Sequence, residues 1–146
     1  MLSAAEFIAT FCCFIFSGAA IYINLVEHPA RMACGTQLAA TVWAPSYKRA
    51  TAMQAPLALV SFLAGALAWV LGAGGMWLVG AVSIGLVIPF TFLVIMPTNQ
   101  QLLTPGRDLA SSETSLLLTK WARLHAVRSL LSTAAALIYL VQLLRI

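Results

Sequence analysis

Four long apolar stretches constrain the fold of this chain more than any other feature of its sequence. They cover about residues 4–27, 50–71, 76–96 and 114–146, and a helix needs about 20 apolar residues to cross a bilayer. Only 8% of the residues are charged, whereas about a quarter are charged in a soluble domain. So few charges cannot cover a water-exposed surface. The sequence therefore predicts an all-α integral membrane protein, with one four-helix transmembrane domain over residues 1–146.

Short connectors predict how the four spans are arranged. Gly72–Gly75 is a turn without charge, so the second and third spans should be antiparallel neighbours. Short connections throughout give an up-down-up-down bundle, in which connectors 28–49 and 97–113 share one membrane side. Basic residues gather in and beside these connectors, which predicts cytoplasmic connectors and termini outside. We interpret four of them as orienting charges only: Lys48, Arg107, Lys120 and Arg123.

Prolines and a tryptophan mark the expected ends of the helices. Pro29 disfavours helical backbone at the residue before it, so the first helix should end or kink there, and Arg31 cannot be placed. Residues 32–49 are expected to form an interfacial connector, with Trp43 as an interface anchor. Pro89 lies inside the third span and should kink it.

One stripe of the last span combines an aromatic ring, a titratable ring and a permanent cation. Trp121, His125 and Arg128 are spaced four and three residues apart, so they share one helix face. Asn24 and His28 repeat the four-residue spacing at the exit of the first span, on the same membrane side. Ionisable residues near hydrocarbon are costly and are treated first as functional candidates.

The other two spans bring further polar residues to this end of the bundle. They are Tyr47, Arg49, Gln54, Thr91, Thr98 and Asn99. A structural hydrogen bond to kinked backbone is the favoured interpretation for Gln54, Thr91 and Thr98. Four spans are therefore expected to contribute to one polar cluster.

An ordered set of short motifs covers nearly the whole chain. The motifs are Gly18-x-Ala20 with Asn24 and His28-Pro29-Ala30-Arg31; Trp43-x-Pro45-Ser46-Tyr47-x-Arg49; Pro89-Phe90-Thr91 with Pro97-Thr98-Asn99 and Leu102; and Trp121-x-x-x-His125-x-x-Arg128. With these motifs the chain resembles the anthrone oxygenase-like membrane family, small four-helix proteins of which most have no assigned reaction. The resemblance implies a membrane oxygenase that oxidises a small apolar aromatic substrate with molecular oxygen and without a cofactor.

Chemical roles follow from that implied reaction. A neutral histidine can remove a benzylic proton near neutral pH, and a fixed cation with amide donors can stabilise the resulting oxyanion. His125 is the expected base, although His28 could exchange roles with it, and Arg128 would act with Asn99 or Asn24. The expected substrate-binding residues are Trp121, Tyr47, Arg49, Asn99 and Thr91.

Two other classes of function stay open. His28 and His125 on one side could together ligate a metal or a haem iron. The chain could also be a non-catalytic membrane subunit or a small transporter. Coupled transport usually needs a carboxylate at mid-bilayer, but Glu27, Asp108 and Glu113 all fall at helix ends or in a loop. A ligand-sized pocket beside His125 would favour an enzyme over a scaffold.

The expected partners follow from the same features. The chain should contact the lipid bilayer and a small aromatic substrate, and it could form a homo-oligomer through its patches of small residues at 17–20 and 64–66. The net charge of +4 is explained by basic residues at the ends of apolar runs, so no nucleic-acid partner is expected. The three cysteines have no CxxC or other metal-binding spacing, so no metal site of that kind is expected.

Overall fold

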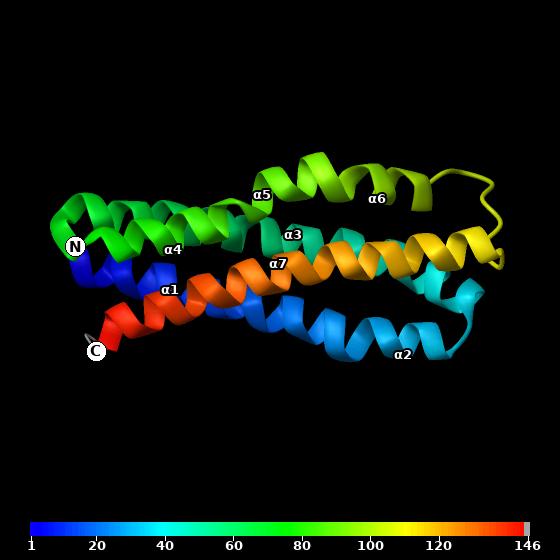
Figure 1. The fold of residues 1–146 in the computed structure, drawn as a ribbon, viewed down its shortest axis with the longest axis horizontal. Coiled ribbons are helices and arrows are strands. Elements are labelled where there is room, and N and C mark those ends of the chain that lie inside the picture. Colours follow the sequence, from blue (N-terminus) through cyan, green and yellow to red (C-terminus); the bar gives the residue numbers. More distant parts are fainter. Residues whose placement is uncertain (145–146) are drawn as a thin grey trace.

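Four long helical spans lie side by side along one axis in the computed structural model, which describes residues 1–144 (Figure 1). The spans Leu2–Ala33, Thr36–Ala73, Gly75–Leu102 and Ser112–Leu144 are each long and apolar enough to cross a membrane. Successive spans are joined at alternating ends of the bundle. The all-α, up-down-up-down arrangement is thereby confirmed, and the chain is a multi-pass membrane protein. The expected final residues of the last span, 145–146, lie outside the described part.

The first span continues past the proline that was expected to end or kink it. It consists of α1 (Leu2–Tyr22), the π-helical turn η1 (Ile23–Glu27) and α2 (His28–Ala33). In the wider turn the His28 N–H bonds to the carbonyl of Ile23, five residues earlier. Pro29 then sits at the start of α2, where proline is tolerated because the first N–H groups of a helix have no intrahelical partner. The end predicted at residue 27 is therefore wrong by six residues.

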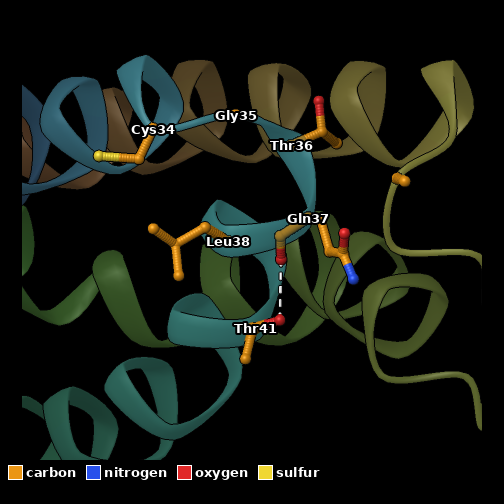
Figure 2. Close-up of a pocket in the computed structure, with 7 residues that line it drawn as sticks. Cys34, Gly35, Thr36, Gln37, Leu38 and Thr41 are labelled. Carbon is orange, nitrogen blue, oxygen red and sulfur yellow. Dashed lines mark hydrogen bonds between the residues drawn. The ribbon is translucent and has the colours of Figure 1, made fainter.

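The second span begins far earlier than its apolar pattern predicts. After a turn at Gly35, whose φ is +91°, α3 runs over Thr36–Ala68 and continues into η2 (Trp69–Ala73) (Figure 2). The predicted connector 32–49 is therefore mostly helix, and Pro45 lies inside it. The helix forms here because it presents a buried face, including Ala39 and Trp43, to the bundle.

The third span is broken into offset pieces, as Pro89 predicts. They are α4 (Gly75–Gly85), α5 (Val87–Phe90), η3 (Thr91–Ile95) and α6 (Met96–Leu102). Figure 1 shows α5 displaced from the axis of α4. The Thr91 hydroxyl donates to the Val87 carbonyl at 2.7 Å, which confirms its expected bond to kinked backbone. The π-helical turn η3 precedes Pro97, and the span continues to Leu102, six residues beyond the predicted end at residue 96.

A loop with side-chain capping leads into the last helix, α7 (Ser112–Leu144). The Ser111 hydroxyl accepts the N–H of Thr114 at 3.2 Å, and the Thr114 hydroxyl donates to the Asp108 carbonyl at 2.7 Å. These bonds satisfy groups that a helix start leaves free. The helix starts two residues before the predicted position.

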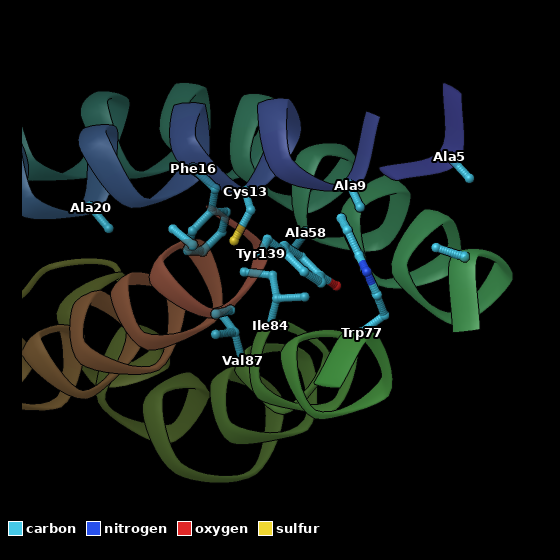
Figure 3. Close-up of a cluster of buried hydrophobic side chains, with 13 residues drawn as sticks. Ala5, Ala9, Cys13, Phe16, Ala20, Ala58, Trp77, Ile84, Val87 and Tyr139 are labelled. Carbon is cyan, nitrogen blue, oxygen red and sulfur yellow. The ribbon is translucent and has the colours of Figure 1, made fainter. Parts of the chain in front are cut away.

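The packing separates an interior from a lipid-facing surface. α1 packs against α3 and α7, and α4 packs against the same two helices. One cluster of buried side chains fills the end of the bundle near the glycine turn (Figure 3), where the Trp77 and Tyr139 rings stack with centroids 5.1 Å apart. Large apolar side chains such as Leu25 and Leu93 are more than 70% exposed, as expected for a surface in contact with lipid.

Candidate functional site

The buried face of α7 carries the residues on which the candidate site is built. Trp121, His125 and Arg128 are 4%, 1% and 9% exposed, so the face predicted from their spacing points into the bundle. α1 and α3 pack against α7 at this level. The neighbours of His125 and Arg128 therefore come from both of these helices and from η1.

The turn η1 places Asn24 against His125. The Asn24 Oδ1 lies 2.6 Å from His125 Nδ1 and accepts a hydrogen bond from the Ser129 hydroxyl at 2.7 Å. The Asn24 Nδ2 donates to the carbonyl of Ala122 at 3.0 Å. Since an amide oxygen can only accept, His125 carries its proton on Nδ1. Its Nε2 is then the ring atom that can accept a proton.

Arg128 is a buried cation without a carboxylate partner among residues 1–144. Its Nη2 donates to Gln54 Oε1 at 2.9 Å, and its guanidinium carbon lies 5.4 Å from the centroid of the Phe16 ring. The Arg128 Nε and the Gln54 Nε2 have no hydrogen-bond partner in that part of the chain. The predicted bond of Gln54 to kinked backbone is wrong, because its oxygen accepts from Arg128 instead.

The segment α2, which continues the first span, adds a second histidine and a second arginine to the site. His28 and Arg31 are 6% and 8% exposed. Arg31 Nη1 lies 3.4 Å from Glu27 Oε1, which also accepts a hydrogen bond from Ser46 at 2.9 Å. The spacing of Asn24, His28 and Arg31 by four and three residues was the sequence feature that could have placed Arg31.

Aromatic rings line the site next to the histidines. Trp121 packs against both imidazoles, with ring centroids 5.4 Å from His28 and 4.8 Å from His125. Trp43 meets Trp121 edge-on at 5.7 Å and stacks on Tyr47 at 5.1 Å. The prediction that Trp43 serves only as an interface anchor is wrong, since it is 1% exposed and lies within the aromatic wall.

Three predicted site residues lie apart from this hydrogen-bonded centre. Arg49 is exposed and lines neither of the cavities in the bundle described below. Asn99 is fully buried, and neither atom of its amide has a hydrogen-bond partner among residues 1–144. Thr98 also lacks one for its hydroxyl, contrary to its predicted structural bond. Thr91 bonds to the backbone and also lines a cavity.

Two cavities inside the bundle meet at Arg128. The first, of about 20 Å³, is lined by His125, Trp121 and Glu27 among others, and it holds about one water molecule. The second, of about 100 Å³, lies between α3, α5 and η3. Neither cavity holds a tricyclic molecule in this conformation. A wider hollow of about 590 Å³ lies at the turn around Gly35, and neither histidine lines it (Figure 2).

The histidines have no metal-binding cluster around them. Among residues 1–144 there is no group of three or more His, Cys, Asp or Glu placed to hold a metal ion. The Nδ1 of His125 is bound to Asn24, whereas the Nδ1 of His28 has no hydrogen-bond partner there. A site made from the two histidines would have to use the Nε2 of His125.

Comparison with known proteins matches the chain to one family model and to curated proteins with the same description. The family model described as anthrone oxygenase matches residues 43–138, about two thirds of the chain. The anthrone oxygenase tpcL of Aspergillus fumigatus is 39% identical over 77 residues, which are 51% of this chain and 48% of that protein. The anthrone oxygenase nsrD of Aspergillus novofumigatus is 42% identical over 57 residues, 37% of this chain and 35% of that protein.

The extent of these matches is limited. The chain spans about half the length of the first of these relatives and about a third of the second. The family match contains Trp43, Tyr47, His125 and Arg128, and it begins after Asn24. No solved structure matches the chain.

Proposed function

The chain belongs to the anthrone oxygenase family, and we propose that it oxidises an anthrone-like aromatic substrate with molecular oxygen, using a histidine base and no bound cofactor. The observation that carries the proposal is the pairing on α7 of His125, which is oriented by Asn24, with Arg128, a buried cation that has no carboxylate partner within residues 1–144. A base and a fixed positive charge within one helical turn suit a substrate that becomes an anion when it loses a proton.

The first step of the proposed reaction is removal of one benzylic proton. The Nδ1–H of His125 bonds to Asn24, which leaves Nε2 to take this proton. The oxygen of Asn24 is occupied by His125 and Ser129, and its nitrogen donates to the Ala122 carbonyl. This favours an orienting role for Asn24, and it leaves Arg128 to stabilise the negative charge that develops on the substrate oxygen.

The second step of the proposal transfers an electron from the carbanion to dioxygen. The carbon radical and superoxide then combine into a peroxide at the same carbon. A base removes the remaining hydrogen of that carbon, the O–O bond breaks, and water leaves after protonation of the departing oxygen. One oxygen atom stays as the new carbonyl, and the other leaves with the two hydrogens of the former CH₂ group.

Reconstituted protein incubated with an anthrone under oxygen tests this proposal. We expect oxygen uptake matched by formation of the quinone, and a fall in kcat of about 10²- to 10⁴-fold in His125→Gln, because a general base contributes about that much. Lys120→Gln changes an exposed residue of the same helix and should retain the wild-type rate. A His125→Gln protein that folds in lipid and keeps the wild-type rate would remove His125 as the base, and His28→Gln then tests the exchanged role.

The alternative hypothesis, that His28 and His125 together bind a metal or a haem iron, has a direct test of its own. Both imidazoles pack against the same indole, so they lie on one side of the bundle. An absorption spectrum and metal analysis of the purified protein decide between metal or haem binding and the cofactor-free proposal. A Soret band, or stoichiometric iron or copper lost in His28→Ala, would overturn the cofactor-free proposal.

We also propose that the end of the bundle with the Gly35 turn faces the cytoplasm. Cations on α3 and α7 are exposed toward this end, namely Lys48, Arg49, Lys120 and Arg123. Lys and Arg are enriched on the cytoplasmic side of membrane proteins. The termini would then lie on the outer side, and the candidate site would be nearer the cytoplasmic side.

A further inference from the structure

Arg128 lies where the two cavities of the bundle meet. The cavity beside His125 and the larger cavity between α3, α5 and η3 share three lining residues, Tyr47, Thr51 and Arg128. We call the larger one the lateral cavity. Its volume of about 100 Å³ adds to a site that otherwise has room for only about one water. The shared residues therefore form a partition between a reactive compartment and a second compartment.

The lateral cavity reaches the lipid-facing surface. Phe92, on η3, is 63% exposed and lines it, and so do the exposed residues Thr51 and Ala55 of α3. The break after α4 displaces α5 from the axis of α4, as Figure 1 shows. The interior wall is mainly apolar and includes Phe16 and Val87. An apolar molecule dissolved in lipid can therefore approach Arg128 from the side of the bundle.

The charge at the inner end of this cavity defines what it can bind. Arg128 is 9% exposed, has no carboxylate partner among residues 1–144, and has an Nε without a hydrogen-bond partner. A buried cation without a counterion is costly, whereas an anionic oxygen at the guanidinium would compensate it. An apolar cavity ending in a cation suits a planar ring system that carries an ionisable hydroxyl.

We propose that the lateral cavity admits a planar aromatic ligand from the lipid and binds it through an oxyanion on Arg128. The inference rests on the proposed function and adds to it the route and the ionisation state of the substrate. The ring enters between α3 and η3, and its oxygen meets the guanidinium at the partition. Tyr47 stacks on Trp43 at this partition, so displacement of the Tyr47 ring would join the two compartments next to His125.

Binding of 1,8-dihydroxyanthraquinone to protein in lipid nanodiscs tests the charge requirement without turnover. Its absorption moves to longer wavelength when a hydroxyl ionises, and empty nanodiscs correct for partition into lipid. We expect saturable binding of the ionised form to the wild type. Arg128→Gln should bind at least about tenfold more weakly, since it loses a charge-assisted hydrogen bond to the oxyanion, and it should bind the neutral form. Anthracene has no hydroxyl, so its affinity should be the same for the wild type and for Arg128→Gln.

A matched pair of substitutions on α3 tests the route. Ala55→Trp places an indole at the mouth of the lateral cavity and should weaken binding at least about tenfold. Ala52→Trp is equally exposed on the same helix, lines neither cavity, and should bind as the wild type does. Thr51→Trp blocks the same mouth and replaces Ala55→Trp if that protein does not fold.

The outcomes separate this inference from the proposed function. Wild-type affinity in both mouth variants, binding of the neutral form to the wild type, or no saturable binding would each overturn the inference. Oxidation of an anthrone at the wild-type rate by Ala55→Trp would overturn the route and leave the proposed reaction standing. Saturable binding that is blocked by Ala55→Trp, in a protein that oxidises no anthrone, would support the ligand site and contradict the oxygenase proposal.

Discussion

Asn24 determines which nitrogen of the His125 ring can act as a base. Its oxygen faces His125 Nδ1 and the Ser129 hydroxyl, and its nitrogen is held by a backbone carbonyl of α7. Reversing the amide would place its oxygen against the Ala122 carbonyl, which can only accept, so this backbone carbonyl determines the orientation. A side chain that cannot accept a hydrogen bond would leave both the imidazole and the hydroxyl without a partner inside the bundle.

Replacement of Asn24 should therefore cost both stability and rate. Asn24→Leu keeps the volume but leaves two buried donors unpaired, which we expect to lower the free energy of unfolding by about 1–3 kcal/mol. Misorientation of the ring should lower kcat about 10²-fold. Ser129→Ala removes only one of the donors and keeps the bond to His125, so its kcat should stay within about threefold of wild type. Equal losses in the two variants would contradict the orienting role.

Which side chains share a helix face could be predicted at the residue scale, but their partners could not. The spacing of Trp121, His125 and Arg128 determines their common face, because it follows from helix geometry alone. The bonds to Asn24 and Gln54 depend on how neighbouring helices are rotated about their axes. Apolar periodicity does not specify that rotation to the accuracy of a hydrogen bond. The cluster was therefore predicted, whereas its internal pairing was not.

The same backbone feature, a π-helical turn shortly before a proline, occurs in two helical spans. It explains why their predicted ends were wrong. In each span a five-residue π-helical turn, η1 or η3, is followed by one residue and then a proline. The N–H of that one residue, His28 or Met96, bonds five residues back. Proline then lies at the start of a new α-helical segment, a position that its fixed φ favours, and the span continues. A rule that ends helices before proline misses this, because widening of a turn leaves no mark in hydrophobic periodicity.

Close packing of Tyr139 against two glycines gives a prediction about the packing of α3, α4 and α7. A Cβ added at Gly65 would overlap the Tyr139 hydroxyl, and one added at Gly80 would lie 2.5 Å from a carbon of the same ring. We expect Gly65→Ala and Gly80→Ala each to lower the free energy of unfolding in detergent by about 1–3 kcal/mol. Gly18→Ala, where nothing lies within 4 Å, should not destabilise the protein.

A second substitution on α7 distinguishes this steric cause from a loss of backbone flexibility. Tyr139→Phe removes the hydroxyl that Gly65→Ala would meet but retains the ring carbons that Gly80→Ala would meet. Combined with Tyr139→Phe, Gly65→Ala should recover part of its lost stability, whereas Gly80→Ala should recover none. Equal recovery in the two double variants would contradict direct contact with Tyr139.

At the scale of the whole molecule, apolar run length and turn length were enough to predict four antiparallel spans. They could not predict that the first three spans have 28 to 38 residues, well beyond the roughly 20 that a bilayer core requires. The largest part of the surplus arises where α3 continues from Lys48 back to Thr36. Such polar segments become helical because they pack against each other, which is a tertiary effect. The candidate site is built partly from these segments, so its extent was underestimated.

The orientation of the whole bundle is tested by the accessibility of its two ends. A protein with Cys12→Ala and Cys13→Ala retains only Cys34, which is exposed beside the Gly35 turn. If this end is cytoplasmic, a membrane-impermeant maleimide should label Cys34 after permeabilisation and not in intact cells. A second protein lacks all three native cysteines and carries Gly75→Cys at the opposite end, where an added side chain meets nothing within 4 Å. It should be labelled in intact cells. The reverse pattern would invert the proposed orientation, and labelling of both ends from outside would contradict a membrane-spanning bundle.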